Sequence, residues 1–320
     1  MNVLLLALEP DTLTETQIER VRAIAPNLRV VVSREREEIE ELLGEIEVVA
    51  GQFPRDLLPK APRLRWFQQW GAGSDWLLQH PEAVTADFLL TNASGVHSIP
   101  ISEHILAFMF AFARALPRAV RDQVEKNWNA PDGSGVFELA DKTMLLIGVG
   151  EIGARTARLA SALGMRVVGV RHDPSKGAEG VSEMHGTDHL PKLLPHADFV
   201  VLTVPLTRET QGMIGEAELH AMKESAYLVN IGRGGTVDEV ALVAALQEGW
   251  IAGAGLDVFE EEPLPVDSRL WAMENVIVTS HYSGSTPHYD ERAFEILLDN
   301  LERYQAGEPL RNVVDKRRGY

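Results

Sequence analysis

Short apolar runs alternate with polar or helical segments along almost the whole chain, and they fall into two series. The first series comprises Val3–Leu8, Leu28–Val32, Glu47–Ala50, Leu64–Gln68 and Phe88–Thr91. The second comprises Thr143–Gly148, Arg166–Arg171, Asp198–Val204, Ala226–Ile231, Ala252–Val258 and Val276–Thr279. Such runs are typical of strands buried on both faces of a parallel sheet. The pattern predicts an α/β fold with two doubly wound parallel-sheet domains, and six strands in the second suit a complete dinucleotide fold.

Two further segments lie outside these runs. Ser98–Pro117 is apolar on nearly every face of a helix, which predicts one helix buried between layers that joins domains or contacts another subunit. Thr286–Tyr304 has a helical pattern, and the short, partly apolar tail Gly307–Asp315 is expected to return to the first sheet.

Composition excludes several classes of partner. The chain has 30 basic and 47 acidic residues and a formal charge of −17, which disfavours nucleic acid or an anionic membrane. It has no cysteine, so disulfides, thiolate catalysis and Cys-ligated metals are excluded, and no metal site is expected.

No targeting or membrane segment is expected either. The apolar start Val3–Leu8 lacks a basic region and a small-residue cleavage site, so it is interpreted as a strand. The apolar stretch Ile101–Leu116 is interrupted by Glu103, His104 and Arg114, which argues against a bilayer span. We therefore expect a cytoplasmic protein.

A glycine-rich motif opens the second series. Gly148-Val149-Gly150-Glu151-Ile152-Gly153 follows a strand and precedes a helical pattern over Ala154–Leu163. In that context G-x-G-x-x-G is the fingerprint of a dinucleotide site: its glycines allow a tight turn, close approach of the pyrophosphate and close helix packing. We therefore predict that Gly148, Gly150, Glu151, Ile152 and Gly153 bind a nicotinamide dinucleotide.

The end of the next strand bears on which dinucleotide binds. An NAD site usually has an acidic residue there, against the ribose hydroxyls. Here the strand runs into Arg171-His172-Asp173. A guanidinium at the ribose suits a 2′-phosphate, so Arg171 favours NADP(H) over NAD(H). Arg171 and His172 are both expected among the cofactor contacts. Two alternatives remain open: Asp173 reaches back as the acidic residue, or Arg171 only stacks on adenine.

Three later strand ends carry a set of polar side chains suited to reducing a 2-oxo acid, namely Arg233, Glu262 and His281. Ligands of open parallel sheets bind beyond these ends. The planar fork of Arg233 can bind a carboxylate and polarise the adjacent carbonyl. His281 can exchange a proton with the carbonyl oxygen, and Glu262 can orient the imidazole. Taken singly, each also has an ordinary structural interpretation.

Asp257 lies at the end of an apolar strand and needs a partner there. The nicotinamide carboxamide is one candidate, and an internal hydrogen bond is the alternative.

With these motifs in order, the chain resembles the D-isomer-specific 2-hydroxyacid dehydrogenase family over almost its full length. The matching segments are Gly71–Asp75, Gly148–Gly153, Val204–Thr207, Val229–Gly234, Gly255–Phe259 through Glu262-Pro263, and Thr279–His281 with Gly284. The resemblance implies a Rossmann domain (97–286) inserted into a flavodoxin-like substrate domain (1–96 and 287–320). It also implies a cleft between the domains, an Arg/Glu/His catalytic set and a homodimer to which the Ser98–Pro117 helix contributes.

The resemblance also implies roles for other residues. The backbone at Ala72 and Gly73 would hold the substrate carboxylate. Further cofactor contacts are expected from the matching segments or beside them, at Pro205, Thr210, Ile231, Asp257 and Gly284. Two positions depart from the family pattern: Ser280 replaces a frequent proline, and Arg171 replaces a frequent aspartate. Formate is disfavoured as substrate because formate dehydrogenases have glutamine where Glu262 stands.

The sequence therefore predicts an NAD(P)-dependent oxidoreductase that interconverts small 2-oxo acids and D-2-hydroxy acids by hydride transfer. A dinucleotide-sensing, corepressor-like module with little turnover is the alternative.

Overall fold

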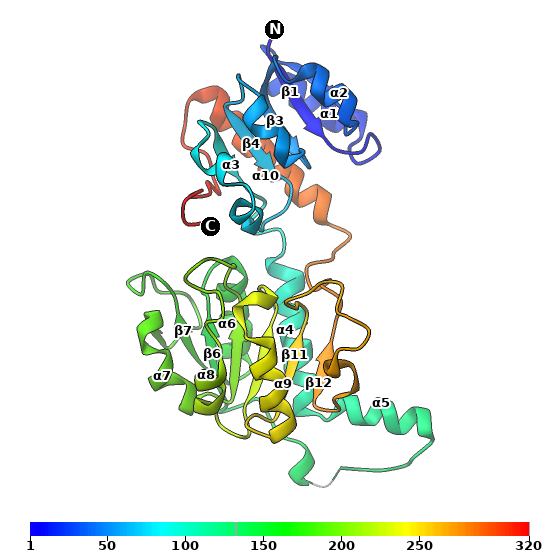
Figure 1. Cartoon of the computed structure of the whole chain (residues 1–320), viewed down its shortest axis with the longest axis vertical. Coiled ribbons are helices and arrows are strands. Elements are labelled where there is room, and N and C mark those ends of the chain that lie inside the picture. The colour runs from blue at the N-terminus through cyan, green and yellow to red at the C-terminus, as the bar shows by residue number, and fades with distance from the viewer. Residues whose placement is uncertain (132, 320) are drawn as a thin grey trace. The chain divides into compact units, whose positions relative to one another are not determined.

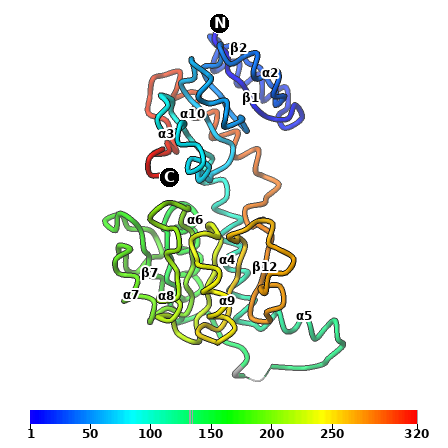
Figure 2. The backbone as a smooth tube through the Cα atoms, viewed as in Figure 1, coloured from blue at the N-terminus to red at the C-terminus, as the bar shows by residue number. Residues whose placement is uncertain are grey.

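The computed structural model describes residues 1–131 and 133–319, so Asp132 and Tyr320 lie outside the described residues. The chain divides into two compact units, one formed by Met1–Val96 with Thr286–Tyr320 and the other by His97–Ser285. Figure 2 traces the chain as it leaves the first unit once and returns to it once.

The first unit is built on one parallel sheet whose five strands, within the described residues, have the order β2-β1-β3-β4-β5. Its strands are β1 (Val3–Ala7), β2 (Arg29–Val32), β3 (Ile46–Gly51), β4 (Trp66–Gln69) and β5 (Leu89–Thr91). Each overlaps one of the predicted runs, with bounds that differ by one or two residues at some ends. The order is that of flavodoxin-like folds.

Helices cover the two faces of this sheet (Figure 1). They are α1 (Glu15–Ile24), α2 (Arg36–Leu42), α3 (Pro81–Thr85) and α10 (Tyr289–Ala306). The sequence sets the start of α1, where Thr14 and Gln17 form a capping box. Its buried residues Ile18 and Val21 stand three apart and therefore share a face toward the core that also contains Leu297 of α10.

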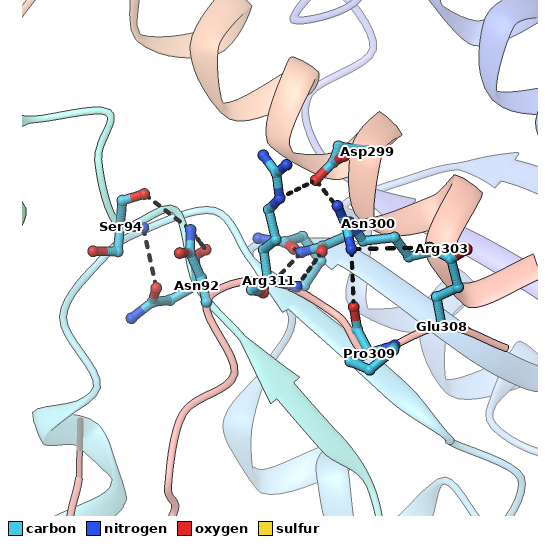
Figure 3. Close-up of polar contacts among 10 residues, drawn as sticks. Asn92, Ser94, Asp299, Asn300, Arg303, Glu308, Pro309 and Arg311 are labelled. Carbon is cyan, nitrogen blue, oxygen red and sulfur yellow. Dashed lines mark hydrogen bonds and ion pairs between the residues drawn. The ribbon is translucent and has the colours of Figure 1, made fainter. Parts of the chain in front are cut away.

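The C-terminal tail joins the first sheet. Val313 forms an antiparallel bridge with Thr91, at the end of β5. Buried Asn300 of α10 holds the tail by accepting from the amide of Arg311 at 2.7 Å and donating to its carbonyl at 3.1 Å. Figure 3 shows these contacts together with Asp299, which pairs with both Arg303 and Arg311.

The second unit contains a parallel sheet of seven strands in the described part of the chain, ordered β12-β11-β10-β9-β6-β7-β8. They are β6 (Thr143–Ile147), β7 (Arg166–Val170), β8 (Glu183–His185), β9 (Phe199–Leu202), β10 (Tyr227–Asn230), β11 (Gly253–Leu256) and β12 (Val276–Val278). This is the Rossmann order with one more strand at the β12 edge. The prediction of six strands was wrong because β8 is a three-residue edge strand with no apolar run.

The long apolar segment before this sheet forms two helices, so the prediction of one helix over Ser98–Pro117 was wrong. Helix α4 (Ser98–Ala113) ends before Ala115, whose left-handed backbone (φ 52°) starts α5 (Leu116–Glu125). Pro117 fits the first turn of a helix but cannot continue one from before, because its nitrogen carries no hydrogen.

Helix α4 is also not buried on all sides. Ile105, Phe108 and Met109 are buried, but Phe110 is 40% exposed. Ile105, Phe108 and Met109 belong to one core with sheet residues such as Leu146 and Val201, whereas Phe110 lies outside that core and remains accessible in the single chain.

The other helices of the second unit are α6 (Glu151–Ala162), α7 (Leu190–Leu193), α8 (Glu216–Ala221) and α9 (Glu239–Glu248). In the described residues no single helix is long and apolar enough to span a membrane. Helices α4 and α5 taken together have the required length and composition, but the chain bends by 66° between them.

Candidate active site

The glycine fingerprint forms the turn between β6 and α6. Gly148 has φ 99°, a conformation that glycine adopts without strain, and a Cβ there would lie 2.9 Å from Thr203. A Cβ on Gly153 would lie 2.2 Å from the carbonyl oxygen of Gly148, so close packing of helix against turn requires glycine. Gly150 faces open space. The first amides of α6, at Glu151 and Ile152, have no acceptor within the helix, which suits a bound phosphate.

Arg171 follows β7 directly, at the position where dinucleotide folds contact the adenosine ribose. Its amide donates to the carbonyl of His185 at 3.0 Å, which fixes its register. Asp173 closes a local turn, because its carboxylate accepts from the amide and hydroxyl of Ser175. These hydrogen bonds, with the charges of Lys176 and Arg171, lower the pKa of Asp173. The carboxylate of Asp173 is thus engaged in its own turn, while His172 is exposed.

The loop after β9 brings Pro205 and Thr210 together. The hydroxyl of Thr210 donates to the carbonyl of Pro205 at 2.6 Å and accepts from the amide of Thr207 at 2.8 Å. Both predicted cofactor residues therefore belong to one closed turn. Ile231, just after β10, is 5% exposed.

The backbone of Arg233 is held in place by its neighbours. The side-chain amide of Asn230, which is 1% exposed, donates to the carbonyl of Arg233 at 3.1 Å and accepts from the amide of Gly232. A Cβ on Gly234 would lie 1.9 Å from the backbone of Phe259, so the turn after Arg233 packs directly on the end of β11. The position of the Arg233 backbone is therefore fixed by two neighbouring strand ends.

His281 and Glu262 form a pair. Nδ1 of His281 lies 2.6 Å from Oε2 of Glu262, and the other carboxylate oxygen accepts from the amide of Phe259 at 3.0 Å. The His281 side chain is 47% exposed and that of Glu262 34%. Because Nδ1 faces the carboxylate, Nε2 is the ring nitrogen left to act on a ligand.

Asp257 is fully buried and holds the loop that carries His281. Its carboxylate accepts from the hydroxyl of Thr279 at 2.6 Å and from the amides of Tyr282 and Ser283 at 3.1 and 3.0 Å. Its carbonyl accepts from the amide of His281 at 2.8 Å. The internal partners that the sequence left as an alternative are present. A carboxylate has about four acceptor positions, so a contact with a carboxamide stays a prediction.

Two histidines contact the segment around His281, and the sequence offered no reason to assign them a role. His104 lies in α4, and His97 directly precedes that helix. Nε2 of His104 donates at 3.0 Å to the hydroxyl of Thr279, whose own hydrogen is used on Asp257. His97 Nδ1 lies 3.1 Å from the carbonyl of Gly284, and a Cβ on that glycine would collide with the ring.

His97 also shows which charged groups gather here. Burial is the main factor that lowers the pKa of His97; the hydrogen bond to Gly284 opposes it, and the charges of Arg233 and His281 lower it further. Both predicted cations are therefore close enough to act on one imidazole. A histidine beside Gly-Val in the sequence carried no signal that could have identified it.

In the first unit, the loop after β4 presents free amides. The carbonyl of Gly71 accepts from Gln69 and Ala93, and the carbonyl of Gly73 accepts from Gln69. Among the described residues, no acceptor contacts the amides of Ala72 and Gly73. Adjacent free amides of this kind suit an anion.

The described residues contain no group of three or more His, Asp or Glu side chains that could hold a metal ion.

Comparisons with known proteins agree on one family. The NAD binding domain of the D-isomer specific 2-hydroxyacid dehydrogenases matches residues 106–283. A glyoxylate reductase of Korarchaeum cryptofilum is 35% identical over 296 residues, which cover 91% of this chain and 87% of that protein.

Two solved structures have the same fold over the full chain. A D-isomer specific 2-hydroxyacid dehydrogenase from Xanthobacter autotrophicus, in complex with NADPH and MES, has a TM-score of 0.85 and 32% identity and covers 100% of this chain and 99% of its own. An NADPH-dependent glyoxylate/hydroxypyruvate reductase from Sinorhizobium meliloti, in complex with NADP and sulfate, has a TM-score of 0.84 and 29% identity and covers 100% of both chains. On this evidence the chain belongs to the D-isomer specific 2-hydroxyacid dehydrogenase family.

Proposed function

We propose that this oxidoreductase interconverts small 2-oxo acids and D-2-hydroxy acids, with a nicotinamide dinucleotide as hydride carrier. The observation that carries the proposal is the 2.6 Å contact between His281 and Glu262, at strand ends of the same sheet that carries the glycine fingerprint. The names of the related reductases support the same class of substrate.

His281 has the geometry of a proton donor and acceptor. When bound, the reduced cofactor supplies a hydride to the carbonyl carbon of the 2-oxo acid. The imidazolium of His281 gives its Nε2 proton to the carbonyl oxygen, so the carbon gains the hydride, the oxygen gains the proton, and the product is the 2-hydroxy acid. Glu262 stabilises the imidazolium through Nδ1 and holds its orientation. In the oxidative direction neutral His281 takes the proton back.

The substrate carboxylate needs positive partners, and two are available. Arg233 offers a guanidinium that can bind the carboxylate and polarise the adjacent carbonyl. The free amides of Ala72 and Gly73 offer further donors to the same group. We assign both to carboxylate binding.

The test is a spectrophotometric assay of the whole chain with NADPH and with NADH on glyoxylate, hydroxypyruvate and phenylpyruvate. We expect loss of nicotinamide absorbance with at least one acid. Tight dinucleotide binding without turnover of any of these acids would overturn the proposed enzymatic function and favour a dinucleotide-sensing module.

We further propose that the enzyme prefers NADPH to NADH. Arg171 stands at the position where NAD-binding proteins have an acidic residue, which would repel a 2′-phosphate. The carboxylate of Asp173 is engaged with Ser175 and does not take over the role of that acidic residue. The NADPH and NADP complexes of related structures support this preference.

Replacing Arg171 with Asp tests this preference. We expect the ratio of kcat/KM for NADPH over NADH to fall by at least about tenfold, because a charge-assisted contact to the 2′-phosphate becomes a repulsion. The ratio is measured at saturating 2-oxo acid. Arg158→Asp, on α6 in the same unit, is the control for the change of charge. An unchanged ratio would remove Arg171 from the cofactor site.

We also propose a homodimer that buries one face of α5. Leu116, Val120 and Val124 recur every fourth residue and are 48%, 60% and 79% exposed, and Trp128 beyond the helix is fully exposed. No residue of α5 is buried, and Figure 1 shows it projecting from the second unit. An apolar stripe of this kind on a projecting helix suits an interface.

The double substitution Val120→Asp with Val124→Asp tests the dimer. We expect the wild-type chain to sediment as a dimer and the variant as a monomer at micromolar concentration, since two unpaired charges would have to be buried. Val266→Asp, also at a nearly fully exposed valine of the second unit, should leave the dimer intact. A variant that remains dimeric places the interface elsewhere.

A further inference from the structure

Gln69 makes two hydrogen bonds across the loop that follows it. It is the last residue of β4 and is 3% exposed. Its side-chain nitrogen donates to the carbonyl of Gly71 at 2.9 Å and to the carbonyl of Gly73 at 2.5 Å. One amide group thus draws together the carbonyls on either side of Ala72.

Trp76 fixes which end of the Gln69 amide faces the loop. Its indole Nε1 lies 2.6 Å from Oε1 of Gln69. An indole nitrogen only donates, so the atom it contacts must be the amide oxygen, and the NH₂ group must face the carbonyls of Gly71 and Gly73. The amide therefore has one orientation that satisfies all three contacts.

The remaining carbonyl of the loop is held in the same way. Asn92, after β5, donates from its side chain to the carbonyl of Ala72 at 2.8 Å, and Asn312 of the tail donates to the carbonyl of Asn92. The carbonyls of three consecutive residues, 71 to 73, are thus all engaged by buried side-chain amides. What the loop offers to a ligand is its unpaired amides.

We infer that Gln69 is a positioning residue for the substrate carboxylate: it turns the carbonyls of Gly71 and Gly73 inward so that the amides of Ala72 and Gly73 are free to bind an anion. The inference rests on the proposed function, in which these amides hold the carboxylate. Gln69 itself touches neither substrate nor cofactor in this assignment.

Gln69→Glu tests the donor while preserving size and shape. The carboxylate can still accept from Trp76, but it presents an oxygen to the two carbonyls and repels them. We expect KM for the 2-oxo acid to rise at least about tenfold, as for loss of a hydrogen bond to a charged group. We expect kcat to change less than about threefold, because the carboxylate is bound alike in ground and transition states, and KM for NADPH to stay unchanged.

Binding of oxamate, a stable 2-oxo acid analogue, to the NADPH-bound enzyme gives a readout independent of turnover. It should weaken by the same factor in Gln69→Glu. Trp76→Phe, which leaves Gln69 intact but removes the indole donor, should weaken it by a smaller factor. Gln69→Met, which keeps the length without a donor or a charge, should reproduce the effect if Gln69→Glu does not fold.

Gln68→Glu is the matched control. Gln68 is the preceding residue of β4, is 1% exposed, and uses its side-chain oxygen to accept from Thr91 and Asn300. It makes no side-chain contact to Gly71–Gly73 among the described residues. We expect this variant to lower Tm, because buried hydrogen bonds are lost. We expect KM and oxamate affinity to stay within about twofold of wild type, because the contacts to Gly71–Gly73 are kept.

Two results separate the possible failures. If wild type neither turns over any 2-oxo acid nor binds oxamate, the proposed function fails and this inference with it. If wild type does both and the folded Gln69 variants match it in KM and oxamate affinity, only the positioning role is overturned.

Discussion

Replacing His281 with Asn should lower kcat by about 10²- to 10⁴-fold, the usual contribution of a positioned acid or base. The reason is geometric: the Nε2 nitrogen that gives and takes the proton is lost, while the loop remains anchored through Asp257. NADPH affinity, measured by fluorescence titration, should change little.

Glu262→Gln should give a smaller loss of kcat than His281→Asn, because the imidazole remains but loses the carboxylate that stabilises its charged form. His189→Asn is the control for His281→Asn, since Nδ1 of His189 likewise contacts a carboxylate, that of Asp188 at 3.0 Å, on an exposed part of the second unit. Full activity in His281→Asn would contradict the proposed chemistry even if the dinucleotide still binds.

Replacing Arg233 with Lys should lower kcat/KM for the 2-oxo acid by about 10²- to 10³-fold, as expected for removal of a preorganised donor to the developing oxyanion. Lysine keeps the charge but not the planar fork that can engage carboxylate and carbonyl together. Steady-state assays at varied concentrations of the 2-oxo acid measure kcat/KM, and stopped-flow assays measure the rate of hydride transfer.

The fixed backbone at Arg233 makes this a clean test. Gly232 and Gly234 pack on the backbones of Val204 and Phe259, so a side-chain change should leave the turn intact. Arg166→Lys, at a surface ion pair with Glu183, controls for the substitution itself. An Arg233→Lys enzyme with wild-type kcat/KM would show that the carboxylate is bound elsewhere.

The sequence alone determined every sheet strand except β8, and it determined the candidate catalytic set. Strands buried on both faces must be continuously apolar, so β1 and β6 could be recognised without any knowledge of their neighbours. Because ligands of parallel sheets bind at strand carboxyl ends, the polar residues after those runs, Arg233 and His281, could be singled out as well.

Elements decided by only a few residues were missed. The edge strand β8 has three residues and forms because β7 offers an unpaired edge, which no local pattern reveals. The break at Ala115 between α4 and α5 has no glycine, and its one local signal is Pro117, which can begin a helix but cannot continue one.

The supporting side chains were likewise settled only by the tertiary structure. Gln69 and Trp76 are seven positions apart, yet nothing in that spacing indicates that an indole orients an amide. Asp257 could be identified from the sequence as buried and in need of partners, but Thr279, Tyr282 and Ser283 become its donors only when β11 and the loop after β12 meet. An apolar pattern is a property of consecutive residues and can be recognised in the sequence. Hydrogen-bond partners depend on the tertiary structure, because a bond of about 3 Å forms only where the fold brings two distant segments together.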